Sequence, residues 1–120
     1  MRVKLFDAEL KIMEILWKNS EASAKQIADI LGKEIGWSKS TTYTMIKRCV
    51  DKGAISRNDP GFICRPTVTA EEAREYKLDE LVNQMYGGAV DRLIASILQS
   101  KKLSYDEIER LKQIVITLEQ

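Results

Sequence analysis

The segment from Ser38 to Gly53, with the sequence SKSTTYTMIKRCVDKG, constrains the fold most, because its pattern is that of a helix with one buried side. Serine is a common helix N-cap, and glycine often ends helices in the left-handed conformation. Between these two residues, apolar groups recur with the period of an α-helix. They are the methyl group of Thr42 and the side chains of Met45, Ile46, Cys49 and Val50. We therefore predict a helix that packs this stripe into the protein core.

The opposite side of this helix carries hydroxyl groups in its N-terminal half and cations in its C-terminal half. A solvated helix face is usually rich in Glu and Lys, because both residues favour the helix. Hydroxyl groups and an aromatic ring can instead reach base edges or phosphates, and Lys and Arg neutralise phosphates. We interpret this side as a DNA-recognition face, and its residues are Ser40, Thr41, Tyr43, Thr44, Lys47 and Arg48. The alternative is an ordinary solvated face.

Two helices are expected before this segment. Asp7 is a candidate N-cap for the first helix. The apolar positions of that helix are Leu10, Met13, Leu16 and Trp17. Ser23 and Gln26 form a capping box that opens the second helix, and Gly32 is expected to end it. The connection from Lys33 to Trp37 would then be longer than the turn of the simplest helix-turn-helix.

A β-hairpin is expected after the central helix. Asn58 to Gly61, with the sequence NDPG, is strong turn chemistry between two β-capable segments, Ala54–Arg57 and Phe62–Thr67. The side chains that can face the core are Ile55, Phe62 and Cys64. Three helices followed by a hairpin is the order of a winged helix-turn-helix, whose hairpin lies near the DNA backbone. We expect Arg57 and Arg65 to point outward and contact phosphates, the alternative being solvated hairpin charges.

The last fifty or so residues are predicted to form helices with apolar faces. Capping boxes begin at Thr69 and Ser104, and Gly87-Gly88 interrupts the pattern. The apolar seam positions are Leu81, Val82, Met85, Tyr86, Val90, Leu93, Ile94, Ile97, Leu98, Leu111, Ile114, Val115 and Leu118. So short a tail cannot bury every seam by itself. We predict a homodimer, whose two-fold symmetry suits a palindromic operator, whereas the alternative is a tail folded onto its own winged helix.

Charge is distributed unevenly, although the net charge of the 120 residues is only +1. Residues 1–69 carry 12 Lys and Arg against 8 Asp and Glu, and Arg2 and Lys4 suggest a basic N-terminal arm. Residues 70–120 carry 7 Lys and Arg against 10 Asp and Glu. This asymmetry suggests a basic module for nucleic acid and a second module with another task. We predict a mainly α protein with a small β-hairpin wing, comprising a winged helix-turn-helix over residues 1–69 and a helical dimerisation region over 70–120.

Histidine and the sequence motifs typical of enzymes and of zinc sites are missing. The chain has no His, no Gly-rich phosphate loop and no GxSxG motif, so we do not expect an enzyme. Cys49 and Cys64 form no CxxC pair and are expected to be small buried hydrophobes, with no metal site and no cofactor. No signal-peptide run and no apolar segment of roughly 18 residues is present, so we expect a cytoplasmic protein without membrane insertion.

The chain resembles the BlaI/MecI/CopY family of winged-helix repressors over nearly its whole length. The matching segments are DAELKIMEILWKN, WSKSTTYTMIKRCVDKGAI, FICRPTVT and the tail from Glu71 to Val115. The resemblance implies a homodimeric repressor on palindromic operators, often upstream of β-lactam-resistance or copper-homeostasis genes. It also implies base and phosphate contacts by Ser40, Thr41, Tyr43 and Thr44, with backbone support from Lys39, Lys47 and Arg48.

Several positions depart from the pattern of this family. Relatives often carry Lys in place of Ser40 and Gln in place of Tyr43, so a different operator sequence is expected. Copper-responsive members end in a cysteine-rich hook, whereas this chain has no Cys after Cys64. Penicillinase-type repressors are cleaved at an Asn-Phe bond, and the resemblance places the Ser96–Ile97 bond there, with a membrane sensor protease as the possible partner.

Two other winged-helix functions remain open at this point. One is a ligand-sensing dimeric regulator of the MarR type, which usually builds an apolar pocket between its DNA-binding and dimerisation regions. The other is a winged helix used only for protein contacts, which would not need a recognition face of cations and hydroxyl groups.

Overall fold

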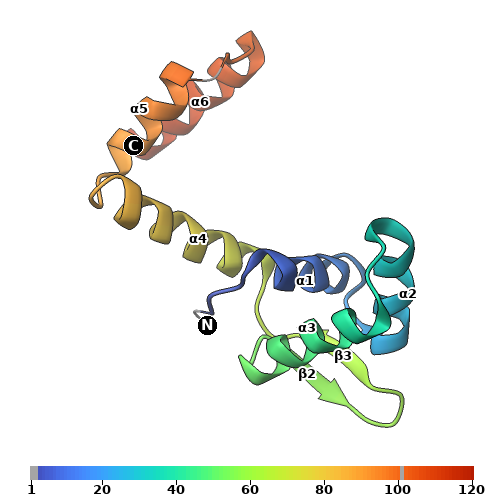
Figure 1. Cartoon of the computed structure of the whole chain (residues 1–120). Coiled ribbons are helices and arrows are strands. Elements are labelled where there is room, and N and C mark those ends of the chain that lie inside the picture. Colours follow the sequence, from blue (N-terminus) through green and yellow to red (C-terminus); the bar gives the residue numbers. More distant parts are fainter. Residues whose placement is uncertain (1–2, 101) are drawn as a thin grey trace. The chain divides into compact units, whose positions relative to one another are not determined.

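The computed structural model describes residues 3–100 and 102–120, so Arg2 of the expected basic arm lies outside the described residues. In chain order, the elements are α1 (Asp7–Asn19), β1 (Ala22–Ser23), α2 (Ala24–Ile35), α3 (Lys39–Asp51), β2 (Ile55–Asn58), β3 (Ile63–Pro66), α4 (Ala70–Met85), α5 (Val90–Ser100) and α6 (Tyr105–Glu119) (Figure 1). This order confirms the predicted winged helix-turn-helix. The chain divides into two compact units, residues 1–78 and 79–120.

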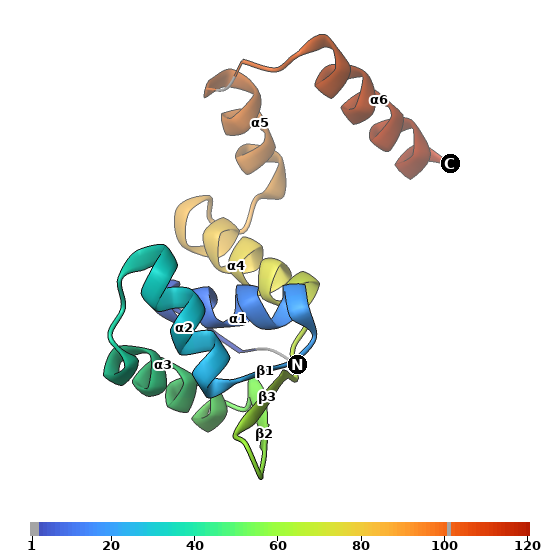
Figure 2. The same cartoon turned by 90° about the vertical axis from the view of Figure 1, so that its right-hand side faces the viewer.

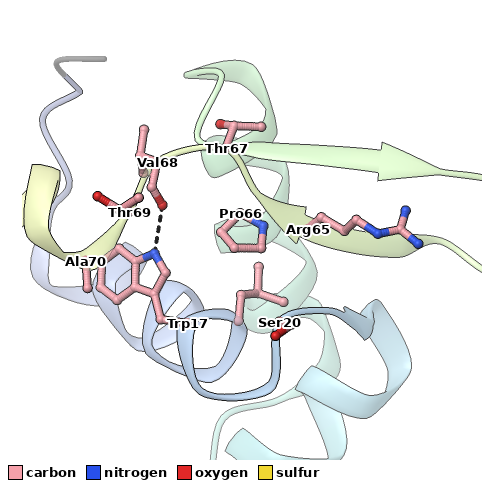
Figure 3. Close-up of a pocket in the computed structure, with 9 residues that line it drawn as sticks. Trp17, Ser20, Arg65, Pro66, Thr67, Val68, Thr69 and Ala70 are labelled. Atoms are coloured by element: carbon pink, nitrogen blue, oxygen red, sulfur yellow. Dashed lines mark hydrogen bonds between the residues drawn. The ribbon is translucent and has the colours of Figure 1, made fainter.

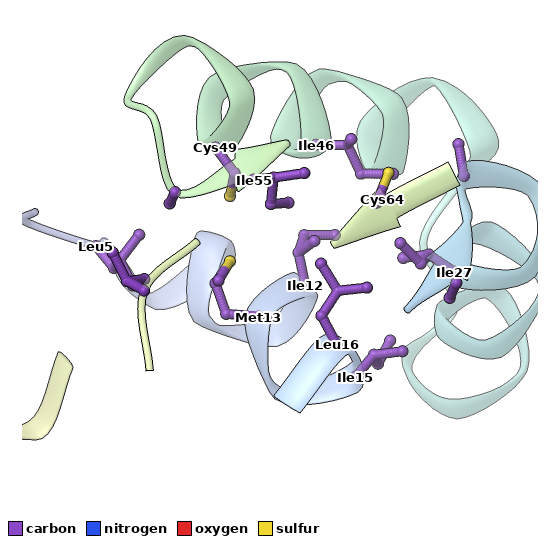
Figure 4. Packing of buried hydrophobic residues seen from close by; sticks show 14 of the residues in the cluster. Leu5, Ile12, Met13, Ile15, Leu16, Ile27, Ile46, Cys49, Ile55 and Cys64 are labelled. Carbon is purple, nitrogen blue, oxygen red and sulfur yellow. The ribbon is translucent and has the colours of Figure 1, made fainter. Parts of the chain in front are cut away.

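The core of the first unit lies among α1, α2, α3 and the small sheet (Figure 4). Ile46 and Cys49 of α3 and Ile12 of α1 are fully buried there. Thr42 is also buried, while Met45 and Val50 are half-buried at the edge. The stripe predicted for the central helix is therefore confirmed. Ser38 caps this helix by accepting a hydrogen bond from the Thr41 amide at 3.1 Å.

The cap of α1 differs from the prediction. Phe6, not Asp7, is the N-cap residue, and Asp7 is the first residue inside the helix. The Glu9 carboxylate accepts a hydrogen bond from the Phe6 amide at 2.7 Å, which satisfies a backbone donor at the helix start. A carboxylate in the third helical position can do this because it folds back over the first turn. The predicted box of Ser23 and Gln26 on α2 is confirmed.

Gly32 does not end α2, contrary to the prediction. The helix runs through Gly32 to Ile35, and Gly36 takes the left-handed conformation with φ of 73°. The Trp37 amide then donates to the Leu31 carbonyl oxygen, at 3.4 Å. Only Gly36, Trp37 and Ser38 separate α2 from α3, so the connection is shorter than predicted. A glycine inside a helix costs little enough that packing can override it, whereas a positive φ strongly favours glycine.

The sheet has three antiparallel strands in the order β1-β3-β2. The predicted hairpin of β2 and β3 is confirmed, and it projects from the three N-terminal helices (Figure 2). Strand β1 was not predicted, because two residues cannot display the alternation of a strand. Ala22 of β1 pairs with Cys64 of β3, which fastens the hairpin to the link between α1 and α2.

Both tryptophans pack against the core, as their partly buried positions show. The Trp17 indole Nε1 donates to the Val68 carbonyl oxygen at 2.8 Å, beside the start of α4 (Figure 3). Thr69 and Glu72 form the predicted capping box of α4. The Trp17 hydrogen bond and the capping box together hold the segment that leads from β3 into α4.

In the second unit, helices α5 and α6 keep most of their apolar residues exposed. Leu93 is buried, but α6 has no buried residue among those described. Gly87 and Gly88 both have positive φ and separate α4 from α5, as predicted. The Tyr86 hydroxyl hydrogen-bonds Ser96 Oγ at 3.1 Å. No helix in the described parts of the chain is long and apolar enough to span a membrane.

Candidate nucleic-acid interface

The DNA-recognition face occupies the side of α3 that points away from the core. Thr42, Ile46 and Cys49 anchor the helix from below and are fully buried. The predicted contact residues on the other side are all exposed, and they are Lys39, Ser40, Thr41, Tyr43, Thr44, Lys47 and Arg48. The structure thus brings these seven side chains together on one accessible surface.

Two hydroxyl groups of this face already make hydrogen bonds within the helix. Thr44 Oγ1 donates to the Ser40 carbonyl oxygen at 2.9 Å, and Ser38 Oγ donates to Thr41 Oγ1 at 3.0 Å. Because the Thr44 hydroxyl has used its proton, its oxygen is left as an acceptor, with the methyl group beside it. An acceptor and a methyl group can contact an exocyclic amine and a thymine methyl in the major groove.

The cations of the recognition face are weakly neutralised. Lys47 lies 3.3 Å from Asp51, but both side chains are well exposed, at 79% and 64%. An exposed pair of this kind contributes at most about 1 kcal/mol, so a phosphate can displace the carboxylate. Within residues 3–100 and 102–120, Lys39 and Arg48 form no ion pair.

The two wing arginines point to opposite faces of the hairpin. Arg57 pairs in register with Cys64, whereas Arg65 pairs with Ser56, and neighbouring residues of a strand alternate between faces. Arg57 therefore shares the face of the buried Cys64, which packs toward the helices. Arg65 lies on the other face and forms an ion pair with Glu21 at 3.0 Å. The structure brings Arg57, but not Arg65, toward the recognition face.

Phe62 connects Arg57 to the recognition helix and was missed as a site residue by the sequence analysis. Its ring stacks on that of Tyr43, with centroids 6.4 Å apart and an interplanar angle of 17°. The Arg57 guanidinium lies 3.6 Å from the centroid of the Phe62 ring. The backbone of Phe62 has φ of 50°, a conformation that costs a non-glycine residue about 1–2 kcal/mol. Nothing in the local sequence signals this role, since an apolar residue after a turn predicts only a core position.

An ion pair between the buried Glu9 and the partly exposed Lys52 holds the C-terminal end of α3. Lys52 Nζ lies 2.5 Å from Glu9 Oε1, and the Glu9 side chain is only 1% exposed. Lys52 also donates to the Lys4 carbonyl oxygen at 2.8 Å and lies over the Phe6 ring. These contacts join the recognition helix to α1 and to the segment before it. They position the site without taking part in it.

Both cysteines are free and buried, which confirms that they act as small hydrophobes. Burial, followed by the nearby charge of Glu9, raises the pKa of Cys49 to about 12. Burial also raises the pKa of Cys64. Neither thiol is therefore a thiolate at neutral pH. Among the described residues, no three potential metal-ligating side chains cluster together.

An exposed helix face of cations and hydroxyl groups, carried on three helices beside a β-hairpin, defines a DNA-binding winged helix-turn-helix protein. The solved structures that are similar to this chain include two of the repressor BlaI. The solution structure of the DNA-binding domain of the repressor BlaI matches with a TM-score of 0.55 and 30% identity, over 60% of this chain and 93% of that one. The solution structure of monomeric Bacillus licheniformis BlaI in complex with the blaP half-operator matches with a TM-score of 0.52 and 31% identity, over 57% and 87%.

The similarity in sequence extends well beyond the winged helix. The family model for the penicillinase repressor matches residues 5–117. The Penicillinase repressor of Bacillus licheniformis is 31% identical over 93% of this chain and 89% of its own length. The Methicillin resistance regulatory protein MecI of Mammaliicoccus sciuri is 32% identical over 93% of each chain. The chain therefore belongs to the penicillinase repressor family.

Proposed function

We propose that this DNA-binding transcriptional repressor recognises a palindromic operator as a homodimer, with α3 of each copy in a major groove. The exposure of the whole recognition face, opposite a fully buried stripe on the same helix, is the observation that carries this proposal. The half-sites would lie about 10 bp, or a multiple of that, apart. One relative named as a repressor and another named as a regulatory protein favour this function over an enzyme, a ligand sensor or a module for protein contacts alone.

We expect some of the exposed residues to contact bases and others to contact phosphates. Ser40, Thr41, Tyr43 and Thr44 lie toward the N-terminal half of α3 and would contact base edges and nearby phosphates. The cations would contact phosphates, and they are Lys39, Lys47, Arg48, Arg57 and Arg65. Arg65 is paired with Glu21 at 3.0 Å and Arg57 with Asp59 at 3.6 Å, so the contact of Arg65 would be the weaker of the two wing contacts.

Exposed apolar residues in residues 79–120 support a homodimer. Helices α5 and α6 line a groove that is almost wholly apolar, formed by residues that include Ile94, Ile97 and Leu111. About half of the surface of Ile94 is exposed, as is 80% of Leu118. Exposed apolar faces of this extent are unfavourable in a monomer. A second copy would cover the predicted seam, of which Val82 and Leu93 are already buried within the chain.

The proposed release mechanism is cleavage of the Ser96–Ile97 bond by a membrane sensor protease. This bond lies inside α5, with Ser96 held by Tyr86 and Ile97 exposed. A protease would require the helix to open locally, which the small buried surface of α5 makes feasible. No cofactor is part of this proposal. Because its proposed partner is DNA, we also propose that the repressor acts in the cytoplasm.

Titration of the full-length protein with a fluorescent duplex tests the proposed function. The duplex should carry the region upstream of the protein's own gene, with a shuffled duplex of equal length as control. We expect tighter binding to the first duplex, with affinity falling steeply as salt rises because phosphate counterions are released. Absent binding, or binding that salt does not change, would contradict the proposal.

A further inference from the structure

Phe62 lies between a residue of the recognition helix and a residue of the wing. One neighbour is Tyr43 of α3, whose ring stacks on that of Phe62 with centroids 6.4 Å apart. The other is Arg57 of β2, whose guanidinium lies 3.6 Å from the Phe62 ring centroid. The three side chains form a layered group, the Tyr43–Phe62–Arg57 stack, which joins the exposed side of α3 to the wing.

The stack is held in place from several sides. Phe62 is half-buried against the core. The preceding residue, Gly61, has φ of 91°, which turns the chain into β3. Asp59 at the wing tip lies 3.6 Å from the Arg57 guanidinium, so the arginine is held by a ring and a carboxylate. The unusual backbone conformation of Phe62 persists because these surroundings determine it.

The outer parts of the stack remain accessible. The Tyr43 ring is restrained by stacking on Phe62. The Tyr43 side chain is still 39% exposed, so part of it faces solvent. The Arg57 side chain is 46% exposed, and a guanidinium has five donors, more than Asp59 can occupy. A tyrosine and an arginine that are already ordered lose less conformational freedom on binding than free side chains do.

We propose that Phe62 is a positioning residue that couples Tyr43 and Arg57, so that the recognition helix and the wing bind DNA as one unit. This inference rests on the proposed function, because it concerns how that same surface is organised. Phe62 contacts no DNA in this arrangement. Phe62 acts through Tyr43 and Arg57, so its removal weakens the DNA contacts of both residues. Their contributions to DNA affinity then become independent of each other.

A double-mutant cycle measures this coupling. The full-length protein carries Tyr43→Leu, Arg57→Ala or both, in the wild-type and in the Phe62→Leu background. The duplex is a sequence that the wild-type protein selects from a random library, and affinities come from fluorescence anisotropy. In the wild-type background, we expect the increase in Kd of the double variant to differ from the product of the two single increases by about threefold to tenfold. In the Phe62→Leu background we expect them to be additive.

Three further variants separate positioning from stability. Phe62→Tyr keeps an aromatic ring and should keep the coupling. Phe6→Leu removes the other phenylalanine of the chain, which contacts Lys52 rather than the wing, and should leave the coupling unchanged. Phe62→Leu alone should weaken binding by about fivefold or less at temperatures where its thermal melt shows a folded protein. If that variant does not fold, the cycle is run in a Phe62→Met background, in which Tyr43→Leu and Arg57→Ala should likewise be additive.

The outcomes are distinguishable from a failure of the proposed function. If the wild-type protein selects no sequence and binds no duplex, the proposed function fails. If it selects a sequence, but Tyr43→Leu and Arg57→Ala are additive in the wild-type background, the coupling alone is overturned. Equal coupling in the Phe62→Leu background would likewise overturn the role of Phe62.

Discussion

At the scale of single residues, the pair of Glu9 and Lys52 shows how the recognition helix is held. The carboxylate is almost fully buried, and its Oε2 has no hydrogen-bond partner among the described residues. The cost of burying the carboxylate is therefore offset only by the hydrogen bonds of Oε1, which accepts from the Phe6 amide and from Lys52 Nζ. A buried charge of this kind depends strongly on its partner, because water cannot replace it.

Replacement of Lys52 by methionine should destabilise the protein substantially. The methionine keeps the aliphatic length but leaves Glu9 buried without its cation, at a cost of about 3 kcal/mol. Urea denaturation followed by circular dichroism measures the loss. The matched control is Lys47→Met, whose partner Asp51 is exposed and which should change stability by less than about 1 kcal/mol. Equal effects of the two substitutions would show that the Glu9 contact is not stabilising.

At the scale of secondary-structure elements, the position of the turn between α2 and α3 depends on two glycines in different conformations. Gly32 is helical, and a Cβ there would meet only the Trp37 carbonyl oxygen at 3.6 Å, an ordinary contact. Gly36 has open space around it but a φ of +73°, which L side chains rarely adopt. Space alone therefore does not decide which glycine can be replaced.

Alanine at these two positions should have opposite effects on stability. Gly32→Ala should stabilise the protein by about 0.5–1 kcal/mol, because alanine is the better residue inside a helix. Gly36→Ala should destabilise it by about 1–2 kcal/mol, because the left-handed conformation strains a residue with a Cβ. Thermal melts of both variants against the wild type measure the difference. A stabilising Gly36→Ala would mean that α2 does not end at that residue.

The recognition helix itself should separate phosphate contacts from base contacts. Lys47→Ala should weaken binding to all sequences and lower the salt slope by about 1, because one phosphate contact is lost. Thr44→Ala should leave that slope unchanged and alter the preference at particular bases by about 1 kcal/mol. Anisotropy titrations at several salt concentrations, on the operator and on single-base variants, distinguish the two. If both substitutions behave alike, the assignment of base and phosphate contacts is wrong.

At the scale of the whole molecule, the chain combines a unit with its own core and a unit with little core. Residues 1–78 contain nearly all of the fully buried apolar side chains, from Ile12 to Cys64. Residues 79–120 expose apolar residues along α5 and α6. The second unit is therefore expected to gain its stability through association, and the affinity for DNA is expected to depend on it.

Removal of the chain from Gly87 onward should produce a folded monomer that binds DNA weakly. The first unit remains whole in this truncation, so the winged helix should still fold. Loss of the second, linked half-site contact should reduce operator affinity by about a hundredfold or more. Analytical ultracentrifugation and anisotropy measure the two effects. A truncated protein that remains a dimer would place the interface elsewhere.

Local features of this protein followed from the sequence alone. The central helix with its Ser38 cap, the capping boxes at Ser23 and Ser104 and the hairpin turn were all predicted, because each depends on residues within about four positions of one another. The DNA-recognition face was predicted for the same reason, since the helical period alone separates it from the buried stripe.

Other features were decided only by the tertiary structure. The opposite faces of Arg57 and Arg65 and the place of Phe62 each depend on contacts between segments that do not follow one another directly in the chain. Strand register determines which arginine approaches α3, and register is set by the pairing of β2 with β3 and of β3 with β1. Local pattern specifies what each segment forms, whereas packing specifies which side chains meet.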